Sequence, residues 1–240
     1  MEKSKNQIKE PISFLYEKYG FNINSIKQVI IGNTYIAVLL TNGNIGVSAN
    51  LLNIKSINLV ELEYININKN SHRNVLNSYY NALLNSEQNN LIKTDIFDYV
   101  NFLQYKNLVM IGFSQPMYNK LKQQDIDISV FDYSSNLDFI KDQNKQKEYL
   151  HRADCVILTA TSFLNNTFFN ITENTNFCDI FIFGASAIMH EDMFKYKNIK
   201  GLFGTVFKKN DKNLIKLIKE GHGQRFTKNY GHKAALIKNI

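Results

Sequence analysis

Two segments within the first 95 residues place apolar side chains at helical spacing. Residues 6–20 form the first segment, which ends at Gly20, a residue type common just past a helix C-terminus. Residues 71–85 form the second segment, with Ser71 as its predicted N-cap. The predicted buried faces are Ile8, Ile12, Leu15 and Tyr19 in the first helix, and Val75, Leu76, Tyr79, Leu83 and Leu84 in the second. The Asn-rich residues 85–90 predict a linker after the second helix.

Apolar runs between residues 25 and 50 predict antiparallel strands. Asn42-Gly43 separates Leu39-Leu40 from the run 45–47, and both turn residues tolerate the positive φ of a tight primed turn. The sequence therefore predicts a hairpin at Asn42-Gly43, within a unit of two or three strands.

The pattern changes after about residue 105. Short apolar runs recur at 108–112, 128–133, 155–160, 179–184 and 201–207, separated by polar or helix-compatible sequence and without strict alternation. Strands that are apolar on both faces are typical of a parallel sheet covered by helices on both sides. We therefore expect an α/β protein with a small N-terminal α+β domain over residues 1–95 and a doubly wound, Rossmann-like parallel sheet domain over residues 96–240.

Composition indicates an ordinary globular protein, with 44% hydrophobic residues and two cysteines. Cys155 and Cys178 lie in or beside apolar runs without CxxC spacing, so we expect buried, inert thiols. Nowhere do 18 apolar residues follow one another, and the first residues hold no continuous apolar stretch. We expect a cytoplasmic protein without membrane contact.

The net charge of +7 is unevenly distributed. Residues 193–240 carry +10, which leaves −3 on residues 1–192, so the sequence suggests a basic C-terminal tail on a near-neutral body. No nucleic-acid-binding motif accompanies this charge. The lysines of 212–219 alternate with Leu214, Ile215, Leu217 and Ile218, which we expect to pack inward. Nucleic acid is therefore not the expected partner.

Ligands of doubly wound sheets bind outside the carboxyl ends of the strands. The segments that follow the predicted strands are 112–116, 132–136, 159–163 and 184–192. They contain no GxGxxG, P-loop or GxSxG pattern, which disfavours a standard dinucleotide site, a P-loop and a serine hydrolase. Asp132 is the strongest single candidate, because a strand-end carboxylate can hold a cofactor hydroxyl or a metal. A structural role in an Asx-turn before Ser134 accounts equally well for an aspartate at this position.

The hydroxyl-rich segment after residue 158 has two interpretations. Thr161 or Ser162 can cap a helix whose buried face is Leu164, Phe168 and Ile171. Capping uses only one of these hydroxyls, however, so the others remain available for another role. The free backbone amides at a helix start favour an anionic ligand. The sequence leaves both interpretations open.

The order of these segments resembles the heavy-metal chelation family, whose members join an enolase N-terminal-like domain to a Rossmann-like domain. The resemblance rests on "IGNTYIAVLLTNGNIGVSAN" and "NVLNSYYNALLN" in the first domain, and on "VMIGFSQPMYNKL", "ISVFDYSSN", "ADCVILTATSFLNNTF", "IFIFGASAIMHEDMF" and "GLFGTVF" in the second. It implies a site in the cleft between the domains, formed by Gly112, Phe113, Ser114, Asp132, Thr159, Ala160, Thr161, Ser162, Gly184, Ala185 and Ser186. The chain departs from the family by having Asp132 where Glu is usual and "GASAIM" where members carry prolines.

Three functions are consistent with these features. The first is a protein that binds a small molecule or a metal complex in the interdomain cleft, with a role in heavy-metal chelation or chelator metabolism. The second is an enzyme with a nucleotide-like cofactor such as S-adenosylmethionine, whose ribose Asp132 would hold. The third is a non-catalytic regulatory domain that acts through the basic segment.

The sequence shows no set of nucleophile, base and acid, so it does not decide whether a reaction is catalysed. The cofactor is left open, with a metal ion or metal complex as the candidate, and so is homo-oligomerisation. His190, Glu191 and Asp192 are adjacent, and neighbours on a helix point about 100° apart. We therefore expect them at a solvent-facing helix start rather than around one metal.

Overall fold

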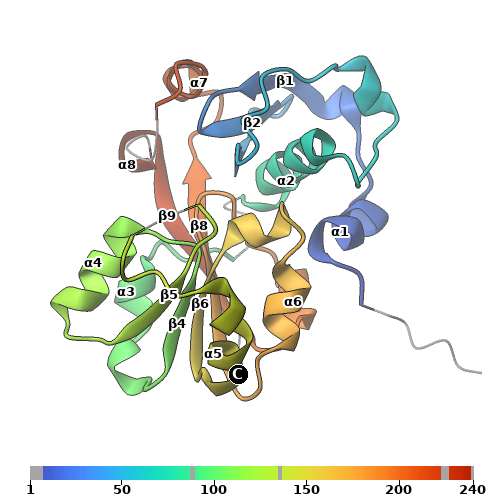
Figure 1. The fold of residues 1–240 in the computed structure, drawn as a ribbon. Coiled ribbons are helices and arrows are strands. Elements are labelled where there is room, and N and C mark those ends of the chain that lie inside the picture. The colour runs from blue at the N-terminus through green and yellow to red at the C-terminus, as the bar shows by residue number, and fades with distance from the viewer. Residues whose placement is uncertain (1–7, 87–89, 135–136, 223–226, 239–240) are drawn as a thin grey trace, which may run out of the picture.

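The computed structural model describes residues 8–86, 90–134, 137–222 and 227–238. It contains two sheets surrounded by helices (Figure 1). The small sheet is antiparallel and consists of β1 (Ile26–Ile31), β2 (Tyr35–Leu40) and β3 (Ile45–Ala49), in that order. The large sheet has the order β5-β4-β6-β7-β8-β9. This mixed α/β architecture confirms the predicted fold class.

The hairpin predicted at Asn42-Gly43 joins β2 to β3, with Leu39 opposite Ile45. Its turn is not the predicted primed type, because only Gly43 of the pair has a positive φ, of 89°. The Gly43 N–H donates to Leu40 C=O at 2.9 Å, and the Leu40 N–H donates to Asn44 C=O at 2.9 Å. A left-handed residue that follows a tight turn is a common way to close a longer hairpin loop.

The two predicted N-terminal helices are α1 (Pro11–Tyr19) and α2 (Asn70–Leu84). Gly20 ends α1 with a φ of 64°, as predicted, but Ile8 precedes the helix and is 50% exposed rather than buried. Helix α2 begins at Asn70, so Ser71 lies inside the helix and is not its N-cap. Part of the predicted linker, residues 87–89, lies outside the described residues.

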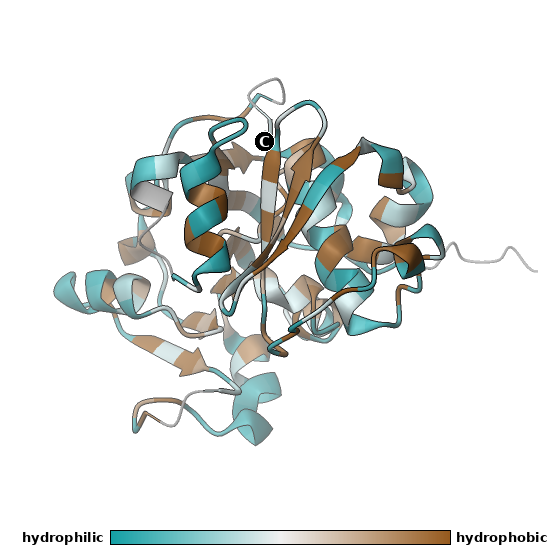
Figure 2. Cartoon of the chain, turned by 90° about the horizontal axis from the view of Figure 1, so that it is seen from above, coloured by the Kyte–Doolittle hydropathy of each residue, from teal (hydrophilic) through white to brown (hydrophobic). Residues whose placement is uncertain are grey.

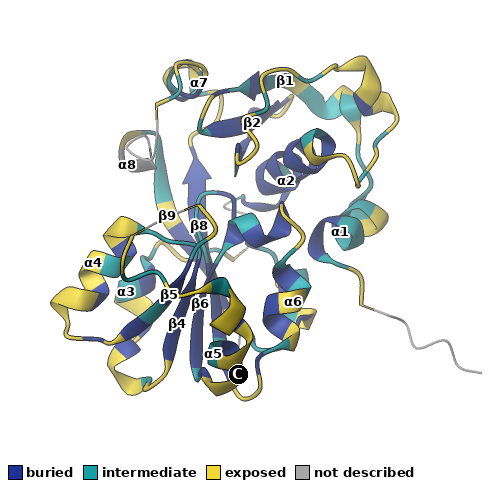
Figure 3. Cartoon of the chain, in the orientation of Figure 1, coloured by how far each residue is buried: buried dark blue, intermediate teal, exposed yellow. Residues whose placement is uncertain are grey.

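Helix α2 lies between the small sheet and α1 and is buried on nearly all sides (Figure 3). The predicted apolar face is confirmed at Val75, Leu76, Tyr79 and Leu84, whereas Leu83 is only half-buried. The opposite, polar face is buried too. Its side chains are His72, Arg73, Asn74, Asn77, Ser78 and Asn81.

Gly46 allows β3 to lie directly against α2. A Cβ at this position would come within 2.2 Å of Ser78 O and of Ala82 N, both of which are backbone atoms. We expect Gly46→Ala to lower the free energy of unfolding by about 1–3 kcal/mol, because the helix and strand must separate. Urea denaturation measures the change, and an unaltered unfolding midpoint would contradict this close approach.

Five of the six strands of the large sheet are parallel, as predicted. They are β4 (Leu108–Ile111), β5 (Ile128–Phe131), β6 (Cys155–Thr159), β7 (Asp179–Phe183) and β8 (Ile199–Phe207). The sixth, β9 (Gly231–Ile237), was not predicted and pairs antiparallel with β8. The apolar stretch Ala234–Ile237 was the available signal, but glycine and histidine at its start suggested a loop.

Helices cover both faces of the large sheet, which explains the absence of alternation in its strands. Alternate strand residues join two core clusters, so that Met110 and Ile157 pack on one face while Val109 and Val156 pack on the other. The helices are α3 (Ile96–Tyr99) and α4 (Gln115–Gln123) on the first face, and α5 (Gln146–Arg152) and α6 (Phe168–Glu173) on the second. Seen from above, hydrophobic strands run between helices with hydrophilic residues (Figure 2).

Short 3-10 helices connect several of these elements. They span Ile23–Ser25, Val60–Glu63, Phe102–Gln104, Gln143–Lys145, Ala160–Phe163 and Glu191–Lys195.

The basic segment 193–240 is not a tail but part of the fold. It supplies β8 and β9 to the large sheet, together with α7 (Lys212–Lys219) and α8 (Thr227–Tyr230). Leu214 and Ile218 of α7 are buried against the small sheet, as their spacing predicted. Helix α7 therefore belongs to the C-terminal half of the chain but packs on the N-terminal sheet. The domain boundary at residues 95 and 96 stays a prediction.

Both cysteines are free and buried, as predicted. Burial in an apolar environment raises the pKa of the Cys178 thiol to about 12 and also raises that of Cys155. Neither thiol is activated as a nucleophile. No helix among the described residues is long and apolar enough to span a membrane.

Candidate functional site

A pocket of about 1180 Å³ lies between the two sheets, and we call it the intersheet pocket. Its floor comes from the loops after β4 and β7, and its walls come from β2, β8, β9 and helices α3, α4, α7 and α8. The lining residues are Tyr35, Thr94–Phe97, Ser114, Pro116, Met117, Lys120, Phe183–Ala185, Phe203–Thr205, Leu217, His222, Asn229, Tyr230, Lys233 and Ala234. Most of them are apolar.

The unequal lengths of the strands create this pocket. Strand β7 ends at Phe183, opposite Phe203, whereas β8 continues to Phe207 and remains paired with β9. The projecting β8–β9 ribbon reaches the small sheet, where Phe207 packs with the β1–β3 core. The ribbon thus forms one wall above the carboxyl ends of the shorter strands, which is where ligands bind in such sheets.

The structure brings three of the predicted site residues to the intersheet pocket: Ser114, Gly184 and Ala185. Ser114 precedes α4, but its side chain forms no capping hydrogen bond. Gly184 has a φ of 122°, and a Cβ there would meet no atom within 4 Å. The other predicted residues lie around the neighbouring strand ends and do not line this pocket.

Gly112, Phe113, Asp132 and Thr159 form a second group at the ends of β4, β5 and β6. A Cβ on Gly112 would come within 2.3 Å of the Thr159 side chain, so the two loops touch. The Phe113 N–H donates to Asp132 Oδ2 at 2.7 Å, and the Ser134 N–H and hydroxyl both donate to Oδ1 at 2.8 Å. The Asx-turn expected before Ser134 is therefore confirmed.

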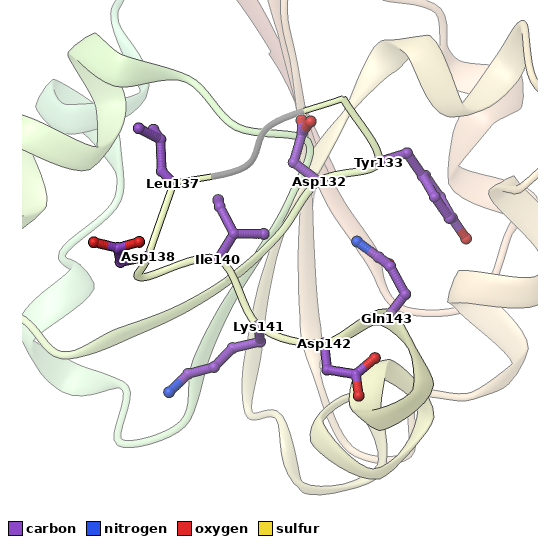
Figure 4. Close-up of a pocket in the computed structure, with 8 residues that line it drawn as sticks. All are labelled: Asp132, Tyr133, Leu137, Asp138, Ile140, Lys141, Asp142 and Gln143. Carbon is purple, nitrogen blue, oxygen red and sulfur yellow. The ribbon is translucent and has the colours of Figure 1, made fainter.

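Asp132 also borders a smaller, open pocket of about 490 Å³ (Figure 4). Its lining residues are Asp132, Tyr133, Leu137, Asp138, Ile140, Lys141, Asp142 and Gln143. Three carboxylates and one lysine give this pocket a net negative charge, whereas one carboxylate and two lysines line the intersheet pocket.

The hydroxyl-rich segment forms a short 3-10 helix rather than the start of α6. Thr159 caps this turn, because its hydroxyl accepts from the Thr161 N–H at 3.5 Å and from the Thr161 hydroxyl at 3.1 Å. The predicted caps Thr161 and Ser162 are therefore wrong, and α6 begins only at Phe168. The expected buried face of Leu164, Phe168 and Ile171 is confirmed.

Ala160 and Ser162 belong to this turn and are buried, and the Ser162 hydroxyl has no hydrogen-bond partner among the described residues. Thr161 is half-buried. The segment therefore lies inside the protein rather than along the intersheet pocket.

Two asparagines on α2, together with its C-cap residue Asn85, hold the loop after β7. Asn81 Nδ2 donates to Ala185 O at 3.0 Å and to Ala187 O at 2.9 Å, and Asn77 Nδ2 donates to Ser186 O at 3.1 Å. Asn85 donates to Ala187 O at 2.7 Å and accepts from the Met189 N–H at 2.6 Å. These residues recur every four positions, and this period was the signal that sequence reasoning missed.

Ser186 completes the attachment of this loop to the small sheet. Its hydroxyl accepts a hydrogen bond from the Ala49 N–H at 2.9 Å, and the side chain is buried. Ser186 therefore positions the loop that carries Gly184 and Ala185, rather than lining the pocket itself.

Sequence reasoning also missed the charged residues of the intersheet pocket. Lys233 on β9 forms a salt bridge with Asp95, and Lys120 on α4 lies 4.7 Å from the centre of the Phe97 ring. Burial alone would raise the pKa of Asp95. Hydrogen bonds from Lys233 and the Phe97 N–H, together with the charges of both lysines, outweigh burial and lower it. Asp95 is therefore a fixed anion beside two cations.

No group of three or more His, Cys, Asp or Glu side chains among the described residues could hold a metal ion. The described residues thus do not fit a bare metal held by protein ligands alone. A helix starts at Glu191, which is exposed as expected, but His190 and Asp192 are not solvent-facing, since their side chains are only 16% and 14% exposed. Asp192 accepts from the Tyr19 hydroxyl at 2.6 Å and from Lys18 at 2.6 and 2.8 Å.

Comparison with known proteins identifies the family. Residues 95–237 match the model of the DUF364 family, described as "Putative heavy-metal chelation", and the chain belongs to this family. No match is found among curated proteins. The resemblance drawn from the sequence is thereby confirmed.

Two solved structures of this family share the fold. A protein with unknown function from Pyrococcus horikoshii is 18% identical with a TM-score of 0.75, covering 89% of this chain and 93% of its own. A second protein with unknown function, from Desulfitobacterium hafniense, is 16% identical with a TM-score of 0.70, covering 94% and 99%. At these coverages both matches extend beyond residues 95–237, the part that the family model covers.

Proposed function

We propose that this protein binds a small organic molecule or a metal complex in the cleft between its two sheets, as part of heavy-metal chelation or chelator metabolism in the cytoplasm. The observation that carries the proposal is the intersheet pocket, which lies at strand carboxyl ends and contains Ser114, Gly184 and Ala185. A largely apolar pocket with a few convergent charged groups is typical of small-molecule sites. Nucleic acid and membranes are not part of the proposal.

The metal-ligating side chains that the protein offers favour the binding of a metal complex over that of a bare metal ion. The described residues offer no three-ligand metal group, whereas a chelator would bring its own donor atoms and leave the protein to recognise an organic surface. The remaining predicted residues, from Gly112 to Ser162, support the floor of the cleft in this proposal.

A single tryptophan would report on the pocket, because the chain has no native Trp. We expect Phe183→Trp, on the pocket wall, to change its emission when a small organic ligand binds. Phe177→Trp is the matched control, since Phe177 is 99% exposed and lies outside the pocket. The titration uses a panel of small aromatic acids, amides and amines, each with and without Zn²⁺. The proposal fails if no member shifts the emission of Phe183→Trp more than that of Phe177→Trp.

A second candidate is an enzyme with a nucleotide-like cofactor such as S-adenosylmethionine. The observation in its favour is Asp132, which follows β5 and borders the pocket of Figure 4 beside the exposed ring of Tyr133. In this alternative, Asp132 accepts from ribose hydroxyls and Asp132→Ala abolishes cofactor binding. Calorimetric titration with S-adenosylmethionine tests it, and the absence of heat for the unaltered protein would reject it.

A further inference from the structure

The polar groups of the intersheet pocket concentrate on one side. Asp95, Lys120 and Lys233 all line the pocket, and both lysines act electrostatically on the same Asp95 carboxylate. Asp95 is fixed, because its Oδ1 accepts from the Phe97 N–H at 3.0 Å and caps α3, and its side chain is only 13% exposed. The Lys233 side chain is 61% exposed, so its ammonium can turn towards a ligand.

This side of the intersheet pocket carries a net positive charge. One carboxylate stands against two ammonium groups, and Lys120 forms no salt bridge within the described part of the chain. A cationic ligand or a bare divalent metal would meet two like charges and one already paired carboxylate. An acidic group would instead complete the charge balance and accept hydrogen bonds from both lysines.

The rest of the pocket is built for a flat apolar body. Aromatic rings line it from five different places in the chain, at Tyr35, Phe97, Phe183, Phe203 and Tyr230, with Met117 and Leu217 between them. Aromatic side chains offer large rigid contact surfaces and prefer to stack on unsaturated rings.

Building on the proposed function, we propose that the intersheet pocket takes a flat, unsaturated organic anion, whose acidic group binds Lys120 and Lys233 and whose body lies against the aromatic walls. Asp95 is the internal counter-ion of Lys233 in the free protein, and it competes with the ligand for the Lys233 ammonium. A metal therefore reaches this pocket inside an anionic complex of such an acid.

The decisive comparison is between an acid and its neutral isostere. Pyridine-2,6-dicarboxylate is a flat acid that chelates divalent metals, and its diamide has nearly the same shape without the charge. We expect the acid, with or without Zn²⁺, to bind Phe183→Trp at least about tenfold more tightly than the diamide, because a charged hydrogen bond exceeds a neutral one. Zn²⁺ alone should produce no change beyond that of Phe177→Trp.

Substitutions assign the charge preference to named residues. Placed in the Phe183→Trp background, Lys233→Met and Lys120→Met should each weaken the acid about three- to tenfold and leave the diamide unchanged, whereas Lys233→Arg should retain binding. Lys122→Met is the control, because Lys122 lies exposed on α4 outside the pocket. Asp95→Asn keeps the capping oxygen and removes the competing charge, so it should tighten acid binding several-fold.

The outcomes separate this inference from the proposed function. Equal binding of acid and diamide, or looser acid binding by Asp95→Asn, would overturn the anion preference while leaving a ligand pocket in place. Binding of only amines from the panel would overturn it as well. If no compound reaches the pocket, the proposed function itself fails.

Discussion

Replacing Arg73 with methionine is expected to lower the free energy of unfolding by about 3–5 kcal/mol, because it leaves a buried carboxylate without its partner. Arg73 Nη1 and Nη2 donate to the two oxygens of Glu10, each at 3.0 Å, and the side chains are only 8% and 14% exposed. The same guanidinium donates to the backbone oxygens of Phe163 and Leu164. One side chain thus joins the start of α1, helix α2 and the turn after β6.

The pH dependence of this loss of unfolding free energy follows from the pKa of Glu10. Burial alone would raise the pKa of Glu10, but hydrogen bonds and charge from Arg73, with hydrogen bonds from Ser13, outweigh it and lower the pKa. A lowered folded pKa stabilises the protein above the unfolded pKa, and this contribution disappears as the pH falls through the folded pKa. The difference between Arg73→Met and the unaltered protein should therefore shrink in acid.

Urea denaturation at neutral and acidic pH measures both effects. Arg152→Met is the matched control, because Arg152 is 74% exposed in its pair with Glu148 and should cost no more than about 0.5 kcal/mol. A similar small loss for Arg73→Met would show that the buried pair contributes little. Glu10→Gln combined with Arg73→Met should cost less than the sum of the single changes, since both remove one interaction.

The hydrophobic pattern predicted the layered architecture because the faces on which a strand or helix is buried determine which of its residues are apolar. Strands such as 155–159 are apolar on both faces, and only a sheet covered on both sides accommodates them. Strand β9 escaped prediction because glycine and histidine at its half-buried start, Gly231 and His232, resemble a loop in sequence. Its pairing with β8 depends on tertiary contacts, which the local sequence pattern does not show.

The site was less predictable than the fold for a physical reason. Strand-end position pointed to Ser114, Gly184 and Ala185, which lie along the intersheet pocket, since the carboxyl ends of parallel strands lie at one edge of a sheet. Asp95 and Lys233 are separated by 138 residues and meet only through the antiparallel strand that was missed. The polar residues of α2 were given no role from the sequence, because their amides replace water for the backbone of a buried loop that lies far away along the chain.

Asn81→Asp is expected to have the second large effect, about 3–5 kcal/mol of unfolding free energy, although it changes the shape of the side chain very little. Asn81 is fully buried, and it accepts from the Val47 N–H at 3.2 Å while its amide donates to two carbonyl oxygens. A carboxylate keeps the first bond but loses both donors. It also places a negative charge against the oxygens of Ala185 and Ala187.

The loop after β7 should respond before the rest of the molecule. The Met189 N–H donates to Asn85, the C-cap residue of α2, so its hydrogen exchange should accelerate in Asn81→Asp more than that of the Val109 N–H in the central strand β4. Asn119→Asp is the control, because Asn119 is exposed and serves as an acceptor for Gln115, a role that aspartate retains. Since Gly184 and Ala185 line the intersheet pocket, ligand binding to Phe183→Trp should weaken in parallel. Unchanged exchange at Met189 together with an unchanged unfolding midpoint would mean that Asn81 does not hold this wall of the pocket.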